Sequence, residues 1–308
     1  MKLLRYGEIG KEKPGILDQD GKIRDLSNHI SDINGDNISK ENLNKISSID
    51  VSLLPIIPDN TRLGACVGNI GKFLCIGLNY SDHAAETGMP VPSEPILFSK
   101  ATSAVVGPND NIEIPRNSVE TDWEVELGII IGKKAKYINE DDAEEYIAGY
   151  CVVNDVSERE FQLKKEGQWT KGKSCDTFGP TGPYLVTKDE VSDVQNLKMY
   201  LDVNGKRMQD GSTKTMIFSA KYIVYYLSQF MSLNPGDVIA TGTPPGVGGG
   251  MKPPVFLKAG DKIKLGIEGL GEQNQTCFQG WFIFTKISLG KFIINFEFLL
   301  YREFQFFD

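Results

Sequence analysis

Residues 123–131 read Trp-Glu-Val-Glu-Leu-Gly-Ile-Ile-Ile, an apolar run that carries two glutamates one residue apart. In a β-strand alternate side chains point to the same face, so Glu124 and Glu126 should project together. A second apolar run, Tyr-Cys-Val-Val-Asn-Asp at 150–155, also ends in a carboxylate, Asp155. The sequence therefore predicts two buried strands that carry three carboxylates.

Three carboxylates on buried strands need positive charge nearby, because burying like charges together is costly. No histidine or cysteine ligand is evident beside Glu124, Glu126 and Asp155. An all-oxygen ligand set is typical of a hard divalent cation such as Mg²⁺ or Mn²⁺. The competing interpretation is a pair of glutamates on a solvated strand face, where this spacing is common. Both interpretations remain open at the level of spacing.

The rest of the pattern favours a mainly β fold. Strands outnumber helices, and no regular alternation of strand and helix occurs, which favours a closed or rolled sheet over a doubly wound one. Asp20-Gly21 and Asn204-Gly205 are typical hairpin turns. Further strands are expected at about 1–5, 73–77, 96–98, 197–203, 238–241 and 262–267, and a helix at about 219–231.

Composition divides the chain into three parts. Residues 1–70 are expected to form a small module that contains β-strands. A linker with two prolines separates this module from the main body. Residues 71–275 form the expected catalytic domain. The remaining tail, 276–308, is rich in phenylalanine and would be prone to aggregation if it were exposed.

Composition and charge exclude several classes of protein. The net charge of −8 argues against a nucleic-acid-binding protein, which needs a basic face. The five cysteines are odd in number and form no CxxC pair, which argues against a disulfide framework or a zinc site. The sequence shows neither an N-terminal apolar signal core nor an apolar run of about 20 residues. We therefore expect a cytoplasmic protein that contacts neither membrane nor nucleic acid.

Several polar residues are candidates for catalysis or binding. His83 and Glu86 are neighbours on a helical turn, and a carboxylate beside an imidazole suits a general base that activates water. Arg159 can form two hydrogen bonds to one carboxylate, and Lys173 can stabilise an oxyanion. Thr243 lies in a glycine-rich loop that lacks the ending of a phosphate loop but can offer hydroxyls to a ligand. For each charged residue taken alone, a solvated surface position is the more common alternative.

Six separated motifs combine these residues with glycine and proline turns. They are Gly77-Leu78-Asn79-Tyr80-x-x-His83-x-x-Glu86, Pro95-Ile96-Leu97-Phe98-x-Lys100, Asp122-Trp123-Glu124-Val125-Glu126-Leu127, Gly149-x5-Asp155-Val156-Ser157-x-Arg159, Gly172-Lys173-Ser174-x-Asp176-x-Phe178-Gly179-Pro180 and Thr241-Gly242-Thr243-Pro244-Pro245-Gly246-Val247-Gly248. In this order they resemble the fumarylacetoacetate hydrolase family, over about 70–275. The first 70 residues resemble the N-terminal module of the longer bacterial members, often labelled ureidoglycolate lyase or 2,4-diketo-3-deoxy-L-fuconate hydrolase. The chain from about residue 276 onward matches nothing in the family.

The resemblance implies an α+β, mainly β fold, a mixed β-roll with the small N-terminal module, and a homodimer. It also implies one Mg²⁺ ion, with Mn²⁺ or Ca²⁺ as alternatives, bound by Glu124, Glu126 and Asp155.

The resemblance assigns six further residues to catalysis and substrate binding. His83 and Glu86 match the dyad that activates water, Lys173 the lysine near the scissile carbonyl, Arg159 and Gln162 two substrate-contacting positions, and Thr243 the threonine that binds the substrate carboxylate.

From these assignments we predict a metal-dependent hydrolase that cleaves a C–C bond of 2,4-diketo acids of the acylpyruvate type, from sugar-acid catabolism. Its partner is then a small anionic keto acid, and its products are pyruvate and a carboxylic acid. Alternatives with the same chemistry are a ureidoglycolate lyase, an oxaloacetate decarboxylase and a dienoate isomerase. A non-catalytic binding protein that uses the tail as an interaction strand is a further alternative, against which the His83–Glu86 pair argues.

Overall fold

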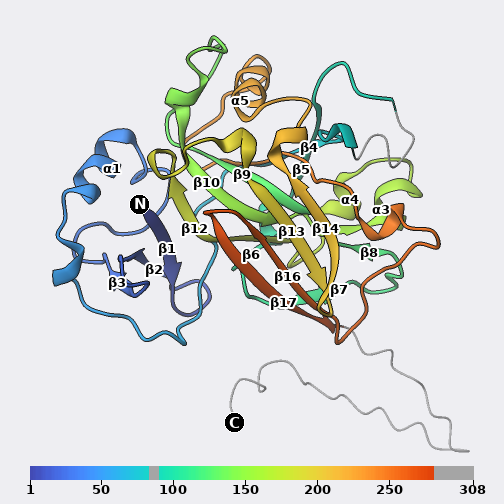
Figure 1. The fold of residues 1–308 in the computed structure, drawn as a ribbon, viewed down its shortest axis with the longest axis horizontal. Helices are drawn as coiled ribbons and strands as arrows, with labels where there is room; N and C mark the ends of the chain where they lie inside the picture. Colours follow the sequence, from blue (N-terminus) through green and yellow to red (C-terminus); the bar gives the residue numbers. More distant parts are fainter. Residues whose placement is uncertain (83–89, 281–308) are drawn as a thin grey trace, which may run out of the picture.

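The computed structural model describes residues 1–82 and 90–280 (Figure 1). A ten-stranded sheet forms its centre, in the order β3-β2-β1-β12-β10-β9-β15-β4-β5, with β6 beside β12. Most neighbouring strands are antiparallel, whereas β15 runs parallel to β4 and β6 parallel to β12. The strands are β1 Lys2–Tyr6, β2 Lys13–Leu17, β3 Ile23–Asp25, β4 Phe73–Gly77, β5 Ile96–Lys100, β6 Val105–Val106, β9 Val125–Ile131, β10 Ile147–Asn154, β12 Gly179–Thr187 and β15 Val238–Ala240.

A second sheet has five strands in the order β14-β13-β16-β17-β7, and β8 and β11 form a separate pair. The mainly β fold class predicted from the sequence is confirmed. The remaining strands are β7 Ile112–Ile114, β8 Thr121–Asp122, β11 Ser157–Glu158, β13 Lys198–Val203, β14 Lys206–Ser212, β16 Lys262–Ile267 and β17 Gly271–Gln279. The α-helices are α1 Lys40–Ser47, α3 Arg159–Leu163, α4 Thr170–Lys173 and α5 Ala220–Ser228.

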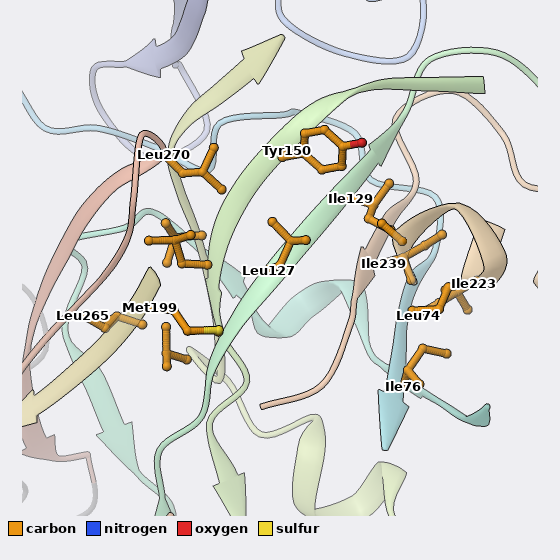
Figure 2. Packing of buried hydrophobic residues seen from close by; sticks show 14 of the residues in the cluster. Leu74, Ile76, Leu127, Ile129, Tyr150, Met199, Ile223, Ile239, Leu265 and Leu270 are labelled. Carbon is orange, nitrogen blue, oxygen red and sulfur yellow. The ribbon is translucent and has the colours of Figure 1, made fainter. Parts of the chain in front are cut away.

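The main hydrophobic core lies between the two sheets. Figure 2 shows Leu127 of β9 among side chains from the second sheet, including Met199 of β13 and Leu265 of β16. On the same side, Ile223 of α5 packs into this cluster. Every residue of β9 and of β10 is buried, as the continuous apolar runs predict. Of the three carboxylates, Glu126 lies in β9, Glu124 directly before it and Asp155 directly after β10, so all three are attached to buried strands.

The predicted hairpin turn and helix are both present. Asn204 and Gly205 have φ of 51° and 77°, the left-handed values that a type I′ turn requires. Ser219 caps α5, because its hydroxyl accepts the backbone N–H of Tyr222 at 3.2 Å. The helix ends at Ser228, three residues before the expected end.

The first 70 residues extend the central sheet. Strand β1 pairs with β12, and β2 and β3 continue the sheet outward, as Figure 1 shows in blue. Leu3 and Ile16 share one buried cluster with Phe73 and Cys151 of the main body. The small N-terminal module thus shares both a sheet and a core with the domain that follows it.

The carboxyl-terminal strand passes the expected boundary at residue 275. Strand β17 continues to Gln279 and pairs in parallel with β7, with Cys277 opposite Ile112. The Cys277 side chain is buried. Four residues that were assigned to the tail therefore belong to the second sheet, and the rest of the tail, 281–308, lies outside the described residues. Across the described residues, none of the helices has both the length and the apolarity that crossing a bilayer requires.

Candidate active site

A cavity of about 430 Å³ lies where β4, β9, α3, α4 and the glycine-rich loop after β15 meet. Its wall contains six of the residues singled out from the sequence. They are Glu124, Glu126, Arg159, Gln162, Lys173 and Thr243. Residues more than a hundred positions apart in the sequence therefore share one cavity.

The three predicted carboxylates come together at the base of this cavity, where Glu124 and Glu126 line the wall and Asp155 lies beside them without lining it. Strands β9 and β10 are antiparallel neighbours, with Glu126 opposite Val153, so that Asp155 follows the end of β10 close to the start of β9. One carboxylate oxygen of Glu124, of Glu126 and of Asp155 lies within 4.8 Å of the other two. All three side chains are buried. Three converging carboxylates are a suitable donor set for a hard divalent cation.

Two lysines enter the cluster from separate elements. Lys173 of α4 donates from Nζ to Glu124 Oε2 at 2.8 Å and to Asp155 Oδ2 at 2.7 Å. Lys100, the last residue of β5, donates to Asp155 Oδ1 and to the carbonyl oxygen of Val156. Both ammonium groups are buried. Burial alone would lower the pKa of Lys173, but the charges of Asp155 and Glu124 raise it above its ordinary value.

Glu126 of β9 and Glu124, the residue directly before β9, differ in their electrostatic surroundings. Burial would raise the pKa of Glu124, but the charges of Lys173 and Arg159 and their hydrogen bonds outweigh burial and lower that pKa. Glu126 accepts the backbone N–H of Gly242 at 2.7 Å. Burial, followed by the charges of Asp155 and Glu124, raises the pKa of Glu126 well above its ordinary value. A cation bound beside Glu126 would therefore favour the ionised form of this carboxyl group.

The charge of the buried cluster fits a divalent metal ion. Four buried carboxylates lie against two buried lysines and one partly buried arginine, so the fully ionised cluster carries one excess negative charge. A divalent cation would change this to one excess positive charge, which favours the binding of an anion. The carboxylates are Asp122, Glu124, Glu126 and Asp155, and the cations are Lys100, Arg159 and Lys173.

Arg159 connects the carboxylate cluster to its surroundings. It is the first residue of α3, and its guanidinium lies 2.7 Å from Glu124 Oε1 and 2.8 Å from Asp122 Oδ2. Its Nη1 donates to Gln162 Oε1 at 3.0 Å, one turn further along the helix. Burial alone would lower the pKa of Arg159, but Asp122 and Glu124 raise it above its ordinary value. Arg159 and Gln162 thus form one unit on the cavity wall.

Asp122 holds this unit against the glycine-rich loop. Its carboxylate is fully buried and accepts the backbone N–H groups of Gly248 at 2.7 Å and Gly249 at 2.9 Å. The same carboxylate accepts Arg159 Nε at 2.8 Å. Asp122 belongs to one of the six motifs, but no role for it was expected from the sequence. The only signal was its place directly before the buried run that begins at Trp123.

The Thr243 hydroxyl is fully engaged within the protein. It donates to the carbonyl oxygen of Val125 at 2.9 Å and accepts Gln209 Nε2 at 2.8 Å. A substrate carboxylate would therefore compete with Val125 for the single hydroxyl proton of Thr243.

The other predicted residues have different outcomes. Lys171, two residues before Lys173, has an exposed side chain that donates to the carbonyl oxygen of Lys165, and it does not line the cavity. His83 and Glu86, the predicted water-activating dyad, lie outside the described residues. The last residue described before them is Asp82. Gly77 and Leu78, a few residues earlier, line the cavity.

Comparison with known proteins identifies the family. Residues 72–277 match the family described as fumarylacetoacetate (FAA) hydrolase C-terminal, which spans most of the chain and includes the whole carboxylate cluster. The chain belongs to the fumarylacetoacetate hydrolase family. The resemblance inferred from the six motifs is thereby confirmed.

Several known proteins are similar to this chain along almost their whole length. A Burkholderia lata protein that is named provisionally as a hydrolase is 60% identical over 276 residues, which are 89% of this chain and 98% of that protein. A fumarylacetoacetate hydrolase from Exiguobacterium antarcticum superposes with a TM-score of 0.80 at 36% identity, covering 91% of this chain and 99% of its own. A maleylpyruvate hydrolase from Sphingobium, solved with manganese(II) and pyruvate, gives a TM-score of 0.76 at 28% identity, covering 91% and 100%.

Proposed function

We propose that this chain is a divalent-metal-dependent hydrolase that cleaves the C–C bond of 2,4-diketo acids of the acylpyruvate type. The observation that carries the proposal is the buried cluster of Glu124, Glu126 and Asp155 at the base of the cavity, with Lys173 in direct contact with two of them. The manganese and pyruvate in the similar maleylpyruvate hydrolase support it, because pyruvate is the product common to all acylpyruvates.

The protein groups have distinct roles in this proposal. Glu124, Glu126 and Asp155 hold the divalent ion, which when bound supplies Lewis acidity to the oxo groups of the substrate. An ammonium has three N–H donors, and two of those on Lys173 go to Glu124 and Asp155, which leaves one for a substrate oxygen. Arg159 adds positive charge to the wall near the substrate carboxylate.

The reaction adds water across the bond between C3 and C4 of the diketo acid. His83, oriented by Glu86, takes a proton from water as its oxygen bonds to C4, which becomes the carboxyl carbon of the released acid. The electron pair of the broken bond goes to C3, which takes up a proton and becomes the methyl group of pyruvate. Lys173 stabilises the negative oxygen that develops at C4.

The test is a product assay with acetylpyruvate in the presence of Mg²⁺ or Mn²⁺, followed by NMR. We expect equimolar acetate and pyruvate, loss of turnover with a chelator, and loss of turnover in Glu126→Gln. His83→Ala should lower kcat by roughly 10²–10⁴-fold, as expected for removal of a general base. The proposal is wrong if acetylpyruvate stays intact while ureidoglycolate or oxaloacetate is consumed, and the role of His83 is wrong if kcat is unchanged.

A further inference from the structure

The cavity has a charged base and an apolar outer wall. The base contains the carboxylate cluster described above, whereas the outer wall contains large apolar side chains from four separate segments. Among them, Leu163 at the end of α3 is 56% exposed although it lines the cavity. An exposed leucine at the mouth of a cavity is a surface that an apolar group can cover. The apolar side chains are those of Phe98, Leu163, Trp169, Pro254 and Phe256.

Two aromatic rings mark the border between base and outer wall. The rings of Phe98 and Trp169 meet edge to face, with centroids 5.2 Å apart. Lys173 Nζ lies 4.9 Å from the centroid of the Phe98 ring, so Phe98 contacts the ammonium of the base as well as Trp169. Trp169 rests on Gly77, where an added Cβ would lie 2.6 Å from the indole ring. The aromatic wall is therefore fixed in place by close packing.

The outer wall offers little to a second anionic group. Its only charged residues among those described are Glu120 and Lys164, which form an ion pair with each other at the mouth. The remaining charged residues of the described wall, Glu124, Glu126, Arg159 and Lys173, all belong to the charged cluster at the base. The cluster with its divalent ion carries one excess positive charge, which a single carboxylate balances. A substrate with one carboxylate, at the pyruvate end, fits this distribution of charge.

The outer wall also offers little to a chain of hydroxyl groups. Hydroxyls placed against Phe98, Trp169 and Phe256 would lose their hydrogen bonds to water without gaining new ones, which costs free energy. A polyhydroxylated acyl group, as the sugar-acid expectation requires, is thus disfavoured by the described wall. An aliphatic or aromatic acyl group instead buries its own apolar surface and that of the cavity wall, which is favourable.

We propose that the apolar outer wall selects 2,4-diketo acids whose acyl group is uncharged and apolar, with Phe98, Leu163 and Trp169 as the residues that determine specificity. This inference deepens the proposed function and rests on it. It assigns the substrate class as monoanionic acylpyruvates with an alkyl or aryl substituent.

The first test compares kcat/KM for acylpyruvates of matched length with Mg²⁺ present. The probes are acetylpyruvate, hexanoylpyruvate, a hexanoylpyruvate analogue with hydroxyls along the acyl chain, and adipoylpyruvate, which carries a terminal carboxylate. Each methylene that becomes buried should raise kcat/KM by about fourfold. Hexanoylpyruvate should therefore exceed acetylpyruvate by well over tenfold, and the other two should fall below it. Equal or faster turnover of adipoylpyruvate or the hydroxylated analogue overturns the inference.

The second test uses Leu163→Ser, which removes an exposed apolar side chain with little effect on folding. It should lower the preference for hexanoylpyruvate over acetylpyruvate by about tenfold, since a leucine side chain is lost from the contact. Leu53→Ser is the matched control, because Leu53 is 80% exposed and does not line the cavity. An unchanged preference in Leu163→Ser, with Leu53→Ser as the reference, counts against the role of the wall.

A binding measurement separates failure of this inference from failure of the proposed reaction. 2-Oxohexanoate and 2-oxoadipate both have six carbons and share the oxo acid end, but they differ in the charge of the far end, and neither needs to be cleaved. With Mg²⁺ present, 2-oxohexanoate should raise Tm more than 2-oxoadipate. If no acylpyruvate is cleaved but this order holds, the wall has the proposed specificity and the reaction is wrong. If acylpyruvates are cleaved but the order is reversed, the specificity is wrong and the reaction stands.

Discussion

Lys173 Nζ lies 2.7 Å from Asp155 Oδ2, and both groups are buried. The same ammonium lies 2.8 Å from Glu124 Oε2, so one lysine bridges two of the three carboxylates proposed to bind metal. A cation and a divalent ion then share the same ligands. The two would repel each other, so under the proposed function we expect Lys173 to lower metal affinity as well as to contact the substrate.

Replacing Lys173 with methionine should separate stability from metal affinity. Without metal, Lys173→Met leaves Glu124 and Asp155 with fewer compensating charges and should cost about 3 kcal/mol of folding free energy. With metal, removal of the competing ammonium should leave Mn²⁺ binding as tight as before or tighter, while turnover of acylpyruvates is lost. The measurements are Tm with chelator and with Mn²⁺, the Kd for Mn²⁺, and kcat.

Lys171→Met is the matched control, because Lys171 is exposed and lies outside the cavity wall two residues earlier. It should change none of the three quantities. Weaker Mn²⁺ binding in Lys173→Met would contradict the electrostatic argument.

Glu126 should show the opposite pattern. Glu126→Gln removes a buried carboxyl group whose pKa is raised by burial and by the charges of Asp155 and Glu124. The metal-free protein should therefore become more stable. The metal-loaded protein should lose the stabilisation that Mg²⁺ provides, about 2.7 kcal/mol when the ion is at a hundredfold excess over Kd. Thermal unfolding with and without Mg²⁺ checks both expectations. Glu120→Gln, at the mouth of the cavity, is the control and should keep its response to Mg²⁺.

Asp122 is expected to act by positioning Arg159. Asp122→Asn keeps the shape of the side chain but turns one acceptor oxygen into a donor, opposite the N–H groups of Arg159, Gly248 and Gly249. The variant should raise KM for acylpyruvates at least tenfold and destabilise the fold by about 3–5 kcal/mol, since a buried ion pair is broken. Its Kd for Mn²⁺ should change little. An unfolded protein would instead lose Mn²⁺ binding, so this measurement separates the positioning role from loss of the fold. Asp210→Asn, at an exposed position, is the control, and an unchanged KM in Asp122→Asn would refute the positioning role.

The carboxylate cluster could be predicted because its geometry follows from strand alternation. Glu124 and Glu126 share a face by the twofold repeat of a strand, and Asp155 ends the neighbouring apolar run. The partners of these carboxylates could not be predicted in the same way. Lys100 contacts Asp155 across 55 positions and Arg159 contacts Asp122 across 37, and such pairings depend on how the sheets fold together.

Strand β12 shows why part of the fold was missed. Its residues 179–187 begin Gly-Pro-Thr-Gly-Pro, and prolines argue against a strand inside a sheet because they lack an N–H donor. The structure places this strand between β1 and β10 all the same. The pairing of β10 with β12 shifts register between Tyr150 and Val152, next to Gly182, and this irregularity accommodates the prolines. Sequence propensity alone carries no information about such a compensating bulge.

Two truncations should locate the end of the folded domain. A chain ending at Gly280 keeps all of β17 and should retain its kcat and Tm, because the family match also ends within this strand, at residue 277. A chain ending at Gln275 loses the parallel pairing of β17 with β7 and the buried Cys277 side chain. That loss should cost roughly 2–4 kcal/mol through lost burial and strand hydrogen bonds. Unfolding midpoints and kcat of both proteins, compared with the full chain, measure the two effects. Loss of activity in a chain that ends at Gly280 and remains folded would show that residues 281–308 contribute to catalysis, and the boundary argued from β17 would then be wrong.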